Sequence, residues 1–268
     1  MIETDHIGVM VISMRVSKNV VEARRQLLAD LLQNQRYLPL EQICIRLSIS
    51  AATARRDLSE LERTGRIRRT PGGALSDFSD KFPSFAERLG RDSDRKNALA
   101  RQVLPHLLSG STVYIDGGTT PFALARLLPD AEIPGLKVVT NSLPVVELLS
   151  GSGVSLHIPG GDLVARQSLL IGERAVRAMR DWKIDVSVLG AEGVTEAGFW
   201  NSAPEVVALQ KAAMENSKKN FVLVTAEKIG HRTGALLASW EAGLRLITDA
   251  TARQLAAENI PTTGMEKI

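Results

Sequence analysis

The chain has 268 residues, of which 44% are hydrophobic and 4% aromatic, and this length is enough for two domains with separate cores. Its formal net charge is only +3, and its single cysteine excludes an intramolecular disulfide and a cysteine-based zinc cluster. No apolar run approaches the roughly 20 residues that span a bilayer. We therefore expect a soluble, cytoplasmic two-domain protein with no cofactor, no metal and no membrane segment.

The first nineteen residues stand apart from the predicted domains. Residues 7–14 are apolar, but this stretch is short, and Glu3 and Asp5 precede it, unlike the basic start of a secretory signal. We expect residues 1–19 to be a disordered extension or the result of a misassigned start codon.

Residues 20–76 predict three short helices and a hairpin. A first helix carries leucines at helical spacing, a second follows Pro39, and Ser50 can N-cap a third that runs to about Thr64. Gly65 ends this third helix, and residues 67–73 predict the two strands of a wing. The apolar positions at helical spacing are Leu27, Leu28, Leu31 and Leu32 in the first helix and Leu40, Ile43, Cys44 and Leu47 in the second, and the expected buried stripe of the third is Ala54, Leu58 and Leu61.

The third helix predicts a DNA-binding surface. In a winged helix-turn-helix, the N-terminal end of this helix enters the major groove. Residues 20–76 contain ten arginines and six acidic residues, a difference of +4, so the positive charge of the chain gathers in this domain. Arginine binds phosphates and guanine edges in a fork geometry. Any one arginine could merely solvate a surface, but the set favours double-stranded DNA as a partner.

A linker at 77–95 leads to an alternation of strands and helices over residues 96–250. Strands are expected at 112–115, 137–140, 154–158, 186–189, 221–224 and 244–247, and helices at 97–108, 121–128, 142–149, 172–180 and 204–216. This order predicts an α/β domain with a mostly parallel sheet. Residues 251–268 complete the chain as a C-terminal helix and tail.

Ligands of such sheets bind beyond the carboxyl ends of the strands. Two glycines and two threonines at the end of the first strand favour an anion, because backbone N–H groups and hydroxyls can face it. The loop lacks the lysine of a nucleotide-binding P-loop, and an ordinary strand-to-helix turn is an equally good local interpretation. The loop residues are Asp116, Gly117, Gly118, Thr119 and Thr120.

Three further strand ends carry small polar residues: Thr140–Ser142, Pro159–Asp162 and Gly190–Gly193. Each alone is better explained as a structural turn. Because parallel strands end at one edge of the sheet, the four turns together predict the floor of a pocket.

The motifs resemble those of the DeoR family of bacterial transcriptional regulators over residues 23–250. The string from Thr53 to Leu58 is the most specific N-terminal match, and the order of the strand-end motifs, Gly172 included, is similar to the family's sensor domain. The resemblance implies a winged helix-turn-helix followed by a domain similar in fold to ribose-5-phosphate isomerase and CoA transferase. It implies an effector that is a phosphorylated sugar or related metabolite.

The resemblance implies two sets of site residues, one for DNA and one for the effector. We expect DNA contacts from Ser50, Ala51, Thr53, Arg55, Arg56, Arg68, Arg69, Gly72 and Gly73. We expect effector contacts from Asp116, Gly117, Gly118, Thr119, Thr120, Asn141, Ser142, Gly160, Gly161, Arg166, Gly190 and Lys228. The loop at 116–120 would hold the phosphate, and Asn141, Gly160 and Gly161 would border the sugar.

Some residues depart from the family pattern, mostly in the part of the pocket that selects the sugar. Ala54, Val164, Glu192 and Thr225 stand where the family usually has Ile or Val, Arg, Asp and Asp, and residues 199–202 replace a threonine-rich segment. The phosphate loop keeps the family pattern, so these departures leave room for an atypical effector.

An enzyme built on the same sheet, an isomerase or CoA transferase, is the main alternative. Its general base would be a carboxylate such as Asp116, Glu192 or Glu205, but the DNA-binding domain argues against this. A third alternative, an architectural DNA-binding protein, leaves the second domain without a role. We expect a regulator, in the first place a repressor of a carbohydrate operon, that forms a homodimer or higher oligomer on repeated half-sites.

Overall fold

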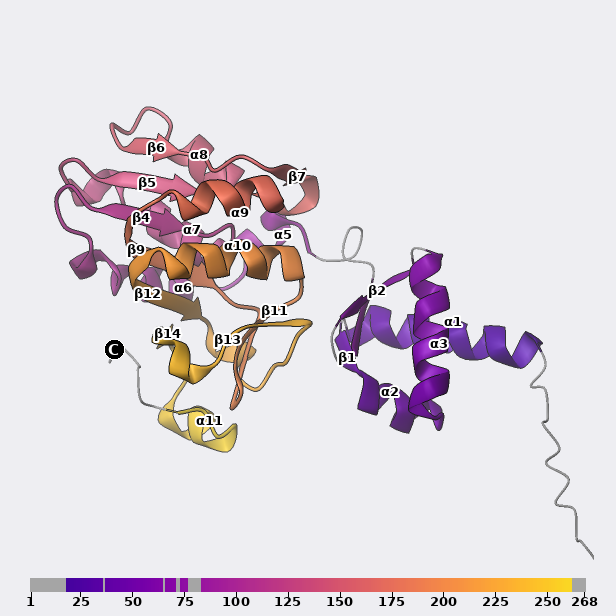
Figure 1. Cartoon of the computed structure of the whole chain (residues 1–268). Helices are drawn as coiled ribbons and strands as arrows, with labels where there is room; N and C mark the ends of the chain where they lie inside the picture. The colour runs from indigo at the N-terminus through magenta and orange to yellow at the C-terminus, as the bar shows by residue number, and fades with distance from the viewer. Residues whose placement is uncertain (1–17, 36, 65, 71–72, 77–82, 262–268) are drawn as a thin grey trace, which may run out of the picture.

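The computed structural model describes residues 18–35, 37–64, 66–70, 73–76 and 83–261. They form an N-terminal domain of helices and a small sheet and a larger C-terminal α/β domain (Figure 1). The predictions made for residues 1–17, Gly65, Pro71, Gly72, residues 77–82 and residues 262–268 lie outside the described residues.

The N-terminal domain contains the predicted three helices and hairpin. Its elements are α1 (Lys18–Gln35), β1 (Tyr37–Pro39), α2 (Leu40–Leu47), α3 (Ala51–Arg63), β2 (Ile67–Thr70) and β3 (Gly73–Ser76). The strand β1 was not predicted, and it pairs antiparallel with β3 to give the order β1-β3-β2. The core contains Leu28, Leu32, Leu38, Ile43, Ala54, Leu58, Leu61 and Ile67, all buried.

The turn between α2 and α3 follows from local chemistry. Ser48 has a φ of 51° and ends α2 in the left-handed conformation, a common helix ending. The hydroxyl of Ser50 then accepts the backbone N–H of Thr53 at 3.2 Å, so the predicted N-cap is confirmed. The turn and the cap together set where α3 begins.

The C-terminal domain is built on the expected parallel sheet. Its six strands lie in the order β14-β12-β9-β4-β5-β6, and every neighbouring pair is parallel. The bounds are β4 (Thr112–Ile115), β5 (Lys137–Thr140), β6 (Ser155–His157), β9 (Ile184–Gly190), β12 (Ser217–Val224) and β14 (Leu244–Thr248). The predicted fold class, α/β with a mostly parallel sheet, is confirmed.

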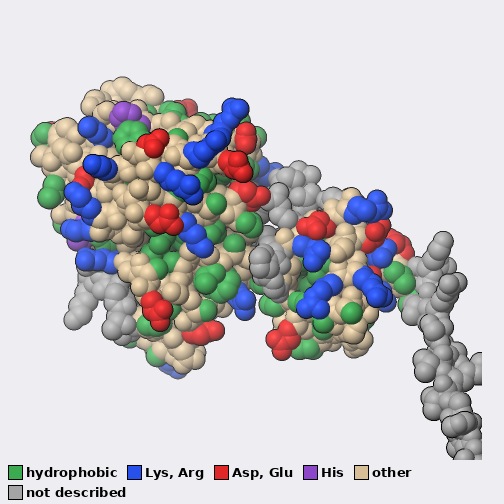
Figure 2. All heavy atoms as spheres, in the orientation of Figure 1, with side chains coloured by type: hydrophobic (Ala, Val, Ile, Leu, Met, Phe, Trp, Pro, Cys, Tyr) green, Lys and Arg blue, Asp and Glu red, His purple; other side chains and the backbone are tan. Residues whose placement is uncertain are grey.

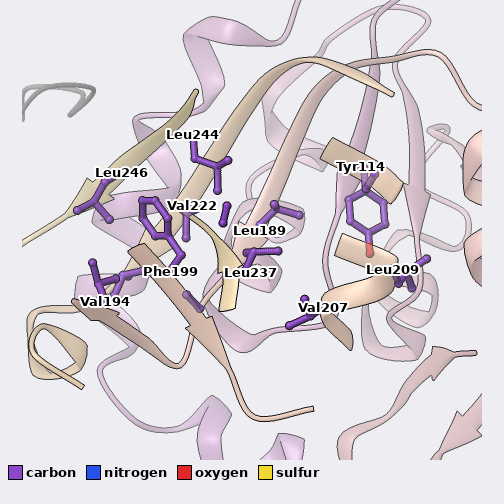
Figure 3. Packing of buried hydrophobic residues seen from close by; sticks show 14 of the residues in the cluster. Tyr114, Leu189, Val194, Phe199, Val207, Leu209, Val222, Leu237, Leu244 and Leu246 are labelled. Atoms are coloured by element: carbon purple, nitrogen blue, oxygen red, sulfur yellow. The ribbon is translucent and has the colours of Figure 1, made fainter. Parts of the chain in front are cut away.

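Helices cover both faces of this sheet (Figure 1). Alternate strand residues point to opposite sides, so Val113 and Ile115 contact one apolar cluster and Tyr114 the other. Figure 3 shows the cluster that contains Tyr114, Leu189 and Phe199. The helices are α5 (Phe85–Leu89), α6 (Ser93–Arg101), α7 (Thr119–Ala125) and α8 (Leu143–Leu149) on one face, and α9 (Glu173–Arg180) and α10 (Pro204–Glu215) on the other; α11 (Ala252–Ala257) follows β14.

Proline shifts two helix bounds from their predicted positions. The helix expected at 97–108 ends at Arg101, and a 3-10 helix at Leu104–His106 follows with Pro105 inside it. The helix expected to begin at Pro121 begins at Thr119, because proline is tolerated in the first turn, where its missing N–H has no helical partner. Thr119 and Thr120 of the polar loop therefore belong to the first turn of α7.

Two small antiparallel sheets were not predicted. One is the hairpin of β7 (Asp162–Val164) and β8 (Leu169–Ile171). The other combines β10 (Gly193–Thr195), β11 (Gly198–Asn201) and β13 (Ala235–Ala238). Both follow carboxyl ends of the main sheet, so they build walls around the edge at which the predicted pocket lies.

Candidate nucleic-acid interface and ligand pocket

The N-terminal end of α3 presents exposed groups in the expected positions. Ala51, Arg55 and Arg56 are exposed and Thr53 is half-buried, while the hydroxyls of Ser50 and Thr53 lie 2.9 Å apart. Within the described residues neither Arg55 nor Arg56 forms an ion pair. Several basic side chains are visible on this domain in Figure 2. Both guanidinium groups are thus available to a ligand outside the domain.

A buried carboxylate fixes the position of α3 against α1. Asp57 is 2% exposed and accepts hydrogen bonds from the Nε atoms of Arg24 at 2.6 Å and Arg25 at 3.0 Å. The sequence analysis counted these arginines only among the positive charges that favour DNA binding. Their structural role was missed because the partner lies more than thirty positions away, although the aspartate directly after Arg55–Arg56 on the apolar side of the helix was a signal.

The wing is connected to α3 through Arg69. Its backbone N–H donates to Glu62 Oε1 at 2.8 Å, and its Nη1 donates to Ser59 Oγ at 2.9 Å. Arg68 lies on β2, one position before it. A Cβ on Gly73 would lie 2.4 Å from the carbonyl oxygen of Leu38, so this glycine is required by the close approach of β1 and β3. Its predicted DNA contact stays a prediction.

Asp116 lies at the centre of the sheet edge and is 4% exposed. Its Oδ2 accepts the backbone N–H of Gly190 at 3.0 Å and the Nε2 of Gln210 at 2.7 Å. Gln210 in turn accepts Asn201 Nδ2 at 2.7 Å. Burial raises the pKa of Asp116, while the hydrogen bonds from Gly190 and Gln210 oppose that shift. Asp116 therefore joins the ends of β4 and β9 to α10.

The loop after β4 lines a small pocket of about 50 Å³. Thr119 and Thr120 are buried, yet neither hydroxyl makes a hydrogen bond within the described residues, and no side chain caps the first turn of α7. The backbone N–H groups of that turn can therefore serve a bound anion. The lining residues are Arg88, Asp116, Gly117, Gly118, Thr119, Thr120, Pro121, Gln167, Leu169, Gly190, Ala191, Glu192, Asn201, Val206, Gln210 and Lys228.

Two basic side chains line this pocket together with the loop. Lys228 donates from Nζ to the carbonyl oxygen of Ala191 at 3.0 Å, and burial lowers its pKa. Arg88, which sequence reasoning did not place in the site, lines the same pocket. An anion would be favoured here, because it would offset the cost that burial imposes on the charge of Lys228.

A carboxylate borders the same cations. Glu192 accepts a hydrogen bond from the hydroxyl of Ser202, and its charge opposes the lowering of the pKa of Lys228. The departure from the family's Asp at this position therefore places a longer acidic side chain beside the predicted sugar.

Not all predicted effector residues meet in this pocket. The loop residues, Gly190 and Lys228 do. Asn141 instead accepts the hydroxyl of Tyr114 at 3.1 Å and donates to the carbonyl of Leu170 at 3.0 Å. Ser142 is fully buried. The Nη2 atom of Arg166 lies 3.4 Å from Glu87 Oε2. The side chains of Asn141 and Arg166 thus join neighbouring segments, whereas Ser142 Oγ has no hydrogen-bond partner among the described residues. Direct contact of these three residues with an effector stays a prediction.

Gly160 and Gly161 lie before the β7–β8 hairpin and outside the pocket lining. Gly161 has a φ of 118°, and a Cβ there would lie 2.3 Å from the carbonyl oxygen of Ile171. The backbone geometry therefore requires glycine at this position. The prediction that both glycines border the sugar stays untested.

Several pocket residues were missed by sequence reasoning, notably Arg88, Gln167, Asn201 and Gln210. They come from α5, the hairpin, β11 and α10, which are far apart in the chain, and no local motif marks them. Across the described residues there is no group of three or more metal-binding side chains. Nor does that part of the chain contain a helix long and apolar enough to cross a membrane.

Comparison with known families identifies both domains. Residues 24–80 match the model of the DeoR-like helix-turn-helix domain, and residues 91–250 match that of the DeoR C terminal sensor domain. The chain is 29% identical over 247 residues to the HTH-type transcriptional repressor GlcR of Bacillus subtilis, covering 91% of this chain and 95% of the relative.

Two further relatives are 30% identical to the chain. One is the glycerol-3-phosphate regulon repressor of Escherichia coli, with 82% of this chain and 88% of the relative covered. The other is the transcriptional repressor AccR of Agrobacterium fabrum, with 91% and 95% covered. The relatives are named as transcriptional repressors, so the chain is a regulator and the alternative of an enzyme is not supported.

The solved structures to which the chain is similar are distant. Ribose 5-phosphate isomerase A of Methanocaldococcus jannaschii matches with a TM-score of 0.39 and 17% identity over 52% of this chain and 55% of that one. The translation initiation factor eIF-2B of Pyrococcus horikoshii matches with a TM-score of 0.39 and 15% identity, over 80% and 73%. Similarities this weak carry no conclusion about activity.

Proposed function

The chain belongs to the DeoR family of transcriptional regulators, and we propose that it represses a carbohydrate uptake or catabolism operon under control of a phosphorylated metabolite. The pocket at the carboxyl edge of the sheet carries this proposal. There an uncapped helix start and two hydroxyls without hydrogen bonds among the described residues line the same pocket as Arg88 and Lys228. A helix start and cationic side chains favour an anion such as a phosphate over a neutral ligand.

The DNA partner would be read by α3. Arg55 and Arg56 are exposed at its N-terminal half and have the fork geometry that pairs with guanine in the major groove. Thr53 and the wing arginines Arg68 and Arg69 would position the domain on phosphates, which set the register without reading sequence. The protein would act in the cytoplasm, where it has access to the chromosome.

Control requires that the effector prefers one arrangement of the protein, since equal affinity for two states shifts nothing. We propose that the protein acts as a homodimer or higher oligomer whose paired DNA-binding domains must match the spacing of two half-sites. A ligand at the sheet edge would change that spacing. The name of the glycerol-3-phosphate regulon repressor, a relative of similar length, supports a small phosphorylated compound as the effector.

Thermal unfolding against a panel of ligands tests the effector class. The panel contains glucose 6-phosphate, fructose 1-phosphate, fructose 6-phosphate, ribose 5-phosphate and glycerol 3-phosphate, with each unphosphorylated parent and inorganic phosphate. A ligand at 100 times its Kd adds about 2.7 kcal/mol of stability. We expect at least one phosphorylated member, and no parent compound, to raise the Tm. Stabilisation by the parent compounds to the same degree would overturn the role of the phosphate.

A further inference from the structure

We propose that Gln167 is a specificity-determining residue of the pocket, and that its side-chain amide hydrogen-bonds a hydroxyl of the sugar beside the phosphate. This inference rests on the proposed function, and it adds a contact that neither the motifs nor the family resemblance assigned. Gln167 ends the 3-10 helix at Ala165–Gln167, between β7 and β8, and lines the pocket together with the loop after β4.

The side chain of Gln167 is buried without being satisfied. It is 4% exposed, and its Nε2 has no hydrogen-bond partner among the described residues. Buried polar groups almost always have partners, because an unmade hydrogen bond costs the full desolvation of the group. A ligand in the pocket would supply the missing hydrogen-bond partner, and this explains why an unsatisfied amide is buried there.

The hairpin holds Gln167 in a fixed place beside the phosphate loop. The N–H of Leu170 donates to Asn141 O at 2.8 Å, Asn141 Nδ2 donates back to Leu170 O at 3.0 Å, and Leu143 N donates to Ser168 O at 2.9 Å. Leu169 packs on the loop itself, since a Cβ on Gly117 would lie 2.9 Å from its Cδ2. The amide is thus presented on a rigid wall, as a specificity contact requires.

The chemistry of the amide points to a hydroxyl. A carboxamide offers donors from Nε2 and acceptor positions on Oε1, and a sugar hydroxyl can accept and donate at once. A phosphate has only acceptor oxygens when fully ionised, and the backbone N–H groups of α7 with Lys228 already suit it. A neutral group beside these cations therefore selects the hydroxylated part of the effector.

The variant Gln167→Met keeps the size of the side chain and removes both hydrogen-bonding groups. The full-length protein and the variant are titrated calorimetrically with the member of the panel that raises the Tm most, and with inorganic phosphate. We expect the variant to bind the sugar phosphate about 10-fold more weakly. Its affinity for inorganic phosphate should stay unchanged, and its Tm without ligand should be equal or higher, because an unsatisfied group has been removed.

Gln102→Met is the matched control, because Gln102 also has a buried carboxamide atom without a partner but lies outside this pocket. It should leave both affinities unchanged. Monodeoxy analogues of the effective sugar phosphate identify the hydroxyl, since one of them should bind wild type and Gln167→Met with equal affinity.

Three results would overturn the inference. Equal binding of the sugar phosphate by wild type and Gln167→Met would remove Gln167 from the site. An equal loss for inorganic phosphate would assign the amide to the phosphate instead of a hydroxyl. A wild type that binds no member of the panel would refute the proposed function itself, and the role of Gln167 with it.

Discussion

Arg56 lies exposed on α3, six positions after Ser50. The hydroxyl of Ser50 caps this helix by accepting the backbone N–H of Thr53 at 3.2 Å. If its guanidinium reads a base edge, Arg56→Ala should weaken operator binding by about 1–3 kcal/mol. The effect is measured by fluorescence anisotropy on a DNA fragment that the purified protein selects from a random library. Arg63→Ala is the control, because Arg63 lies at the other end of α3 and pairs with Glu60 at 2.6 Å. Equal losses for both variants would contradict base recognition by Arg56.

Lys96 is a buried cation whose charge should appear in the pH dependence of stability. Its Nζ donates to the carbonyl oxygens of Arg88 at 2.8 Å and Arg91 at 2.5 Å, and burial lowers its pKa to about 8. Between this value and the unfolded value of 10.5, the unfolded chain binds more protons than the folded one. Stability attributable to Lys96 therefore rises with pH across that window.

The comparison of wild type with Lys96→Met isolates this contribution. Between pH 8 and pH 10, the free energy of unfolding of the wild type should increase relative to the variant by roughly 2 kcal/mol. Urea unfolding of both proteins at several pH values measures the difference. If the difference in free energy of unfolding between the two proteins stays constant or falls across this range, the pKa of Lys96 is not lowered in the folded protein.

At the scale of elements, Asp57 holds α1 and α3 in one orientation. Replacing it with Asn removes the charge between Arg24 and Arg25, which are 18% and 24% exposed, so the loss should be smaller than for a fully buried pair. We expect Asp57→Asn to lower the free energy of unfolding of the N-terminal domain by about 2 kcal/mol, measured by urea unfolding. Operator affinity should fall as well, because α3 would lose its fixed position.

Glu60→Gln is the control for this change, since Glu60 pairs with Arg63 on the exposed side of the same helix. Exposed pairs contribute little to stability because solvent screens them, so Glu60→Gln should leave the free energy of unfolding nearly unchanged. If both variants lost the same stability, Asp57 would be only one more surface charge and not the connection between the two helices.

The elements that sequence reasoning found are those with a local signal. The third helix was marked by Ser50 and an apolar stripe, and the strands at 112–115 and 137–140 by continuous apolar runs that both sheet faces bury. The β7–β8 hairpin and the small sheet of β10, β11 and β13 have three or four residues per strand, too few for a period to emerge. Their existence depends on what they pack against.

The site residues likewise divide into those with a local sequence signal and those without one. The loop at 116–120 could be placed at the pocket from the rule that ligands bind beyond the carboxyl ends of strands, and Gly190 and Lys228 lie with it. Gln167 had no signal, because its significance lies in a missing partner that only three-dimensional packing reveals. The proposed boundaries at 19, 76, 95 and 250 and the direct contacts of the site residues stay predictions.

At the scale of the whole molecule, the central claim is that a phosphorylated ligand in the C-terminal domain controls the DNA affinity of the N-terminal domain. Gly118→Val separates the two activities. A Cβ at this position would lie 3.2 Å from the Cδ of Pro121, and the two methyl groups beyond it would occupy the space of the anion. The N-terminal domain is untouched by this change.

The decisive measurement is the affinity of the full-length protein for its selected DNA fragment, with and without each member of the ligand panel, for wild type and Gly118→Val side by side. We expect a phosphorylated member to change the wild-type affinity 5-fold or more, a usual size for allosteric coupling of about 1 kcal/mol or above, and its parent compound to have no effect. Gly118→Val should bind DNA like the wild type and not respond. A wild-type affinity that no phosphorylated member changes, or a Gly118→Val protein that responds fully, would contradict the claim.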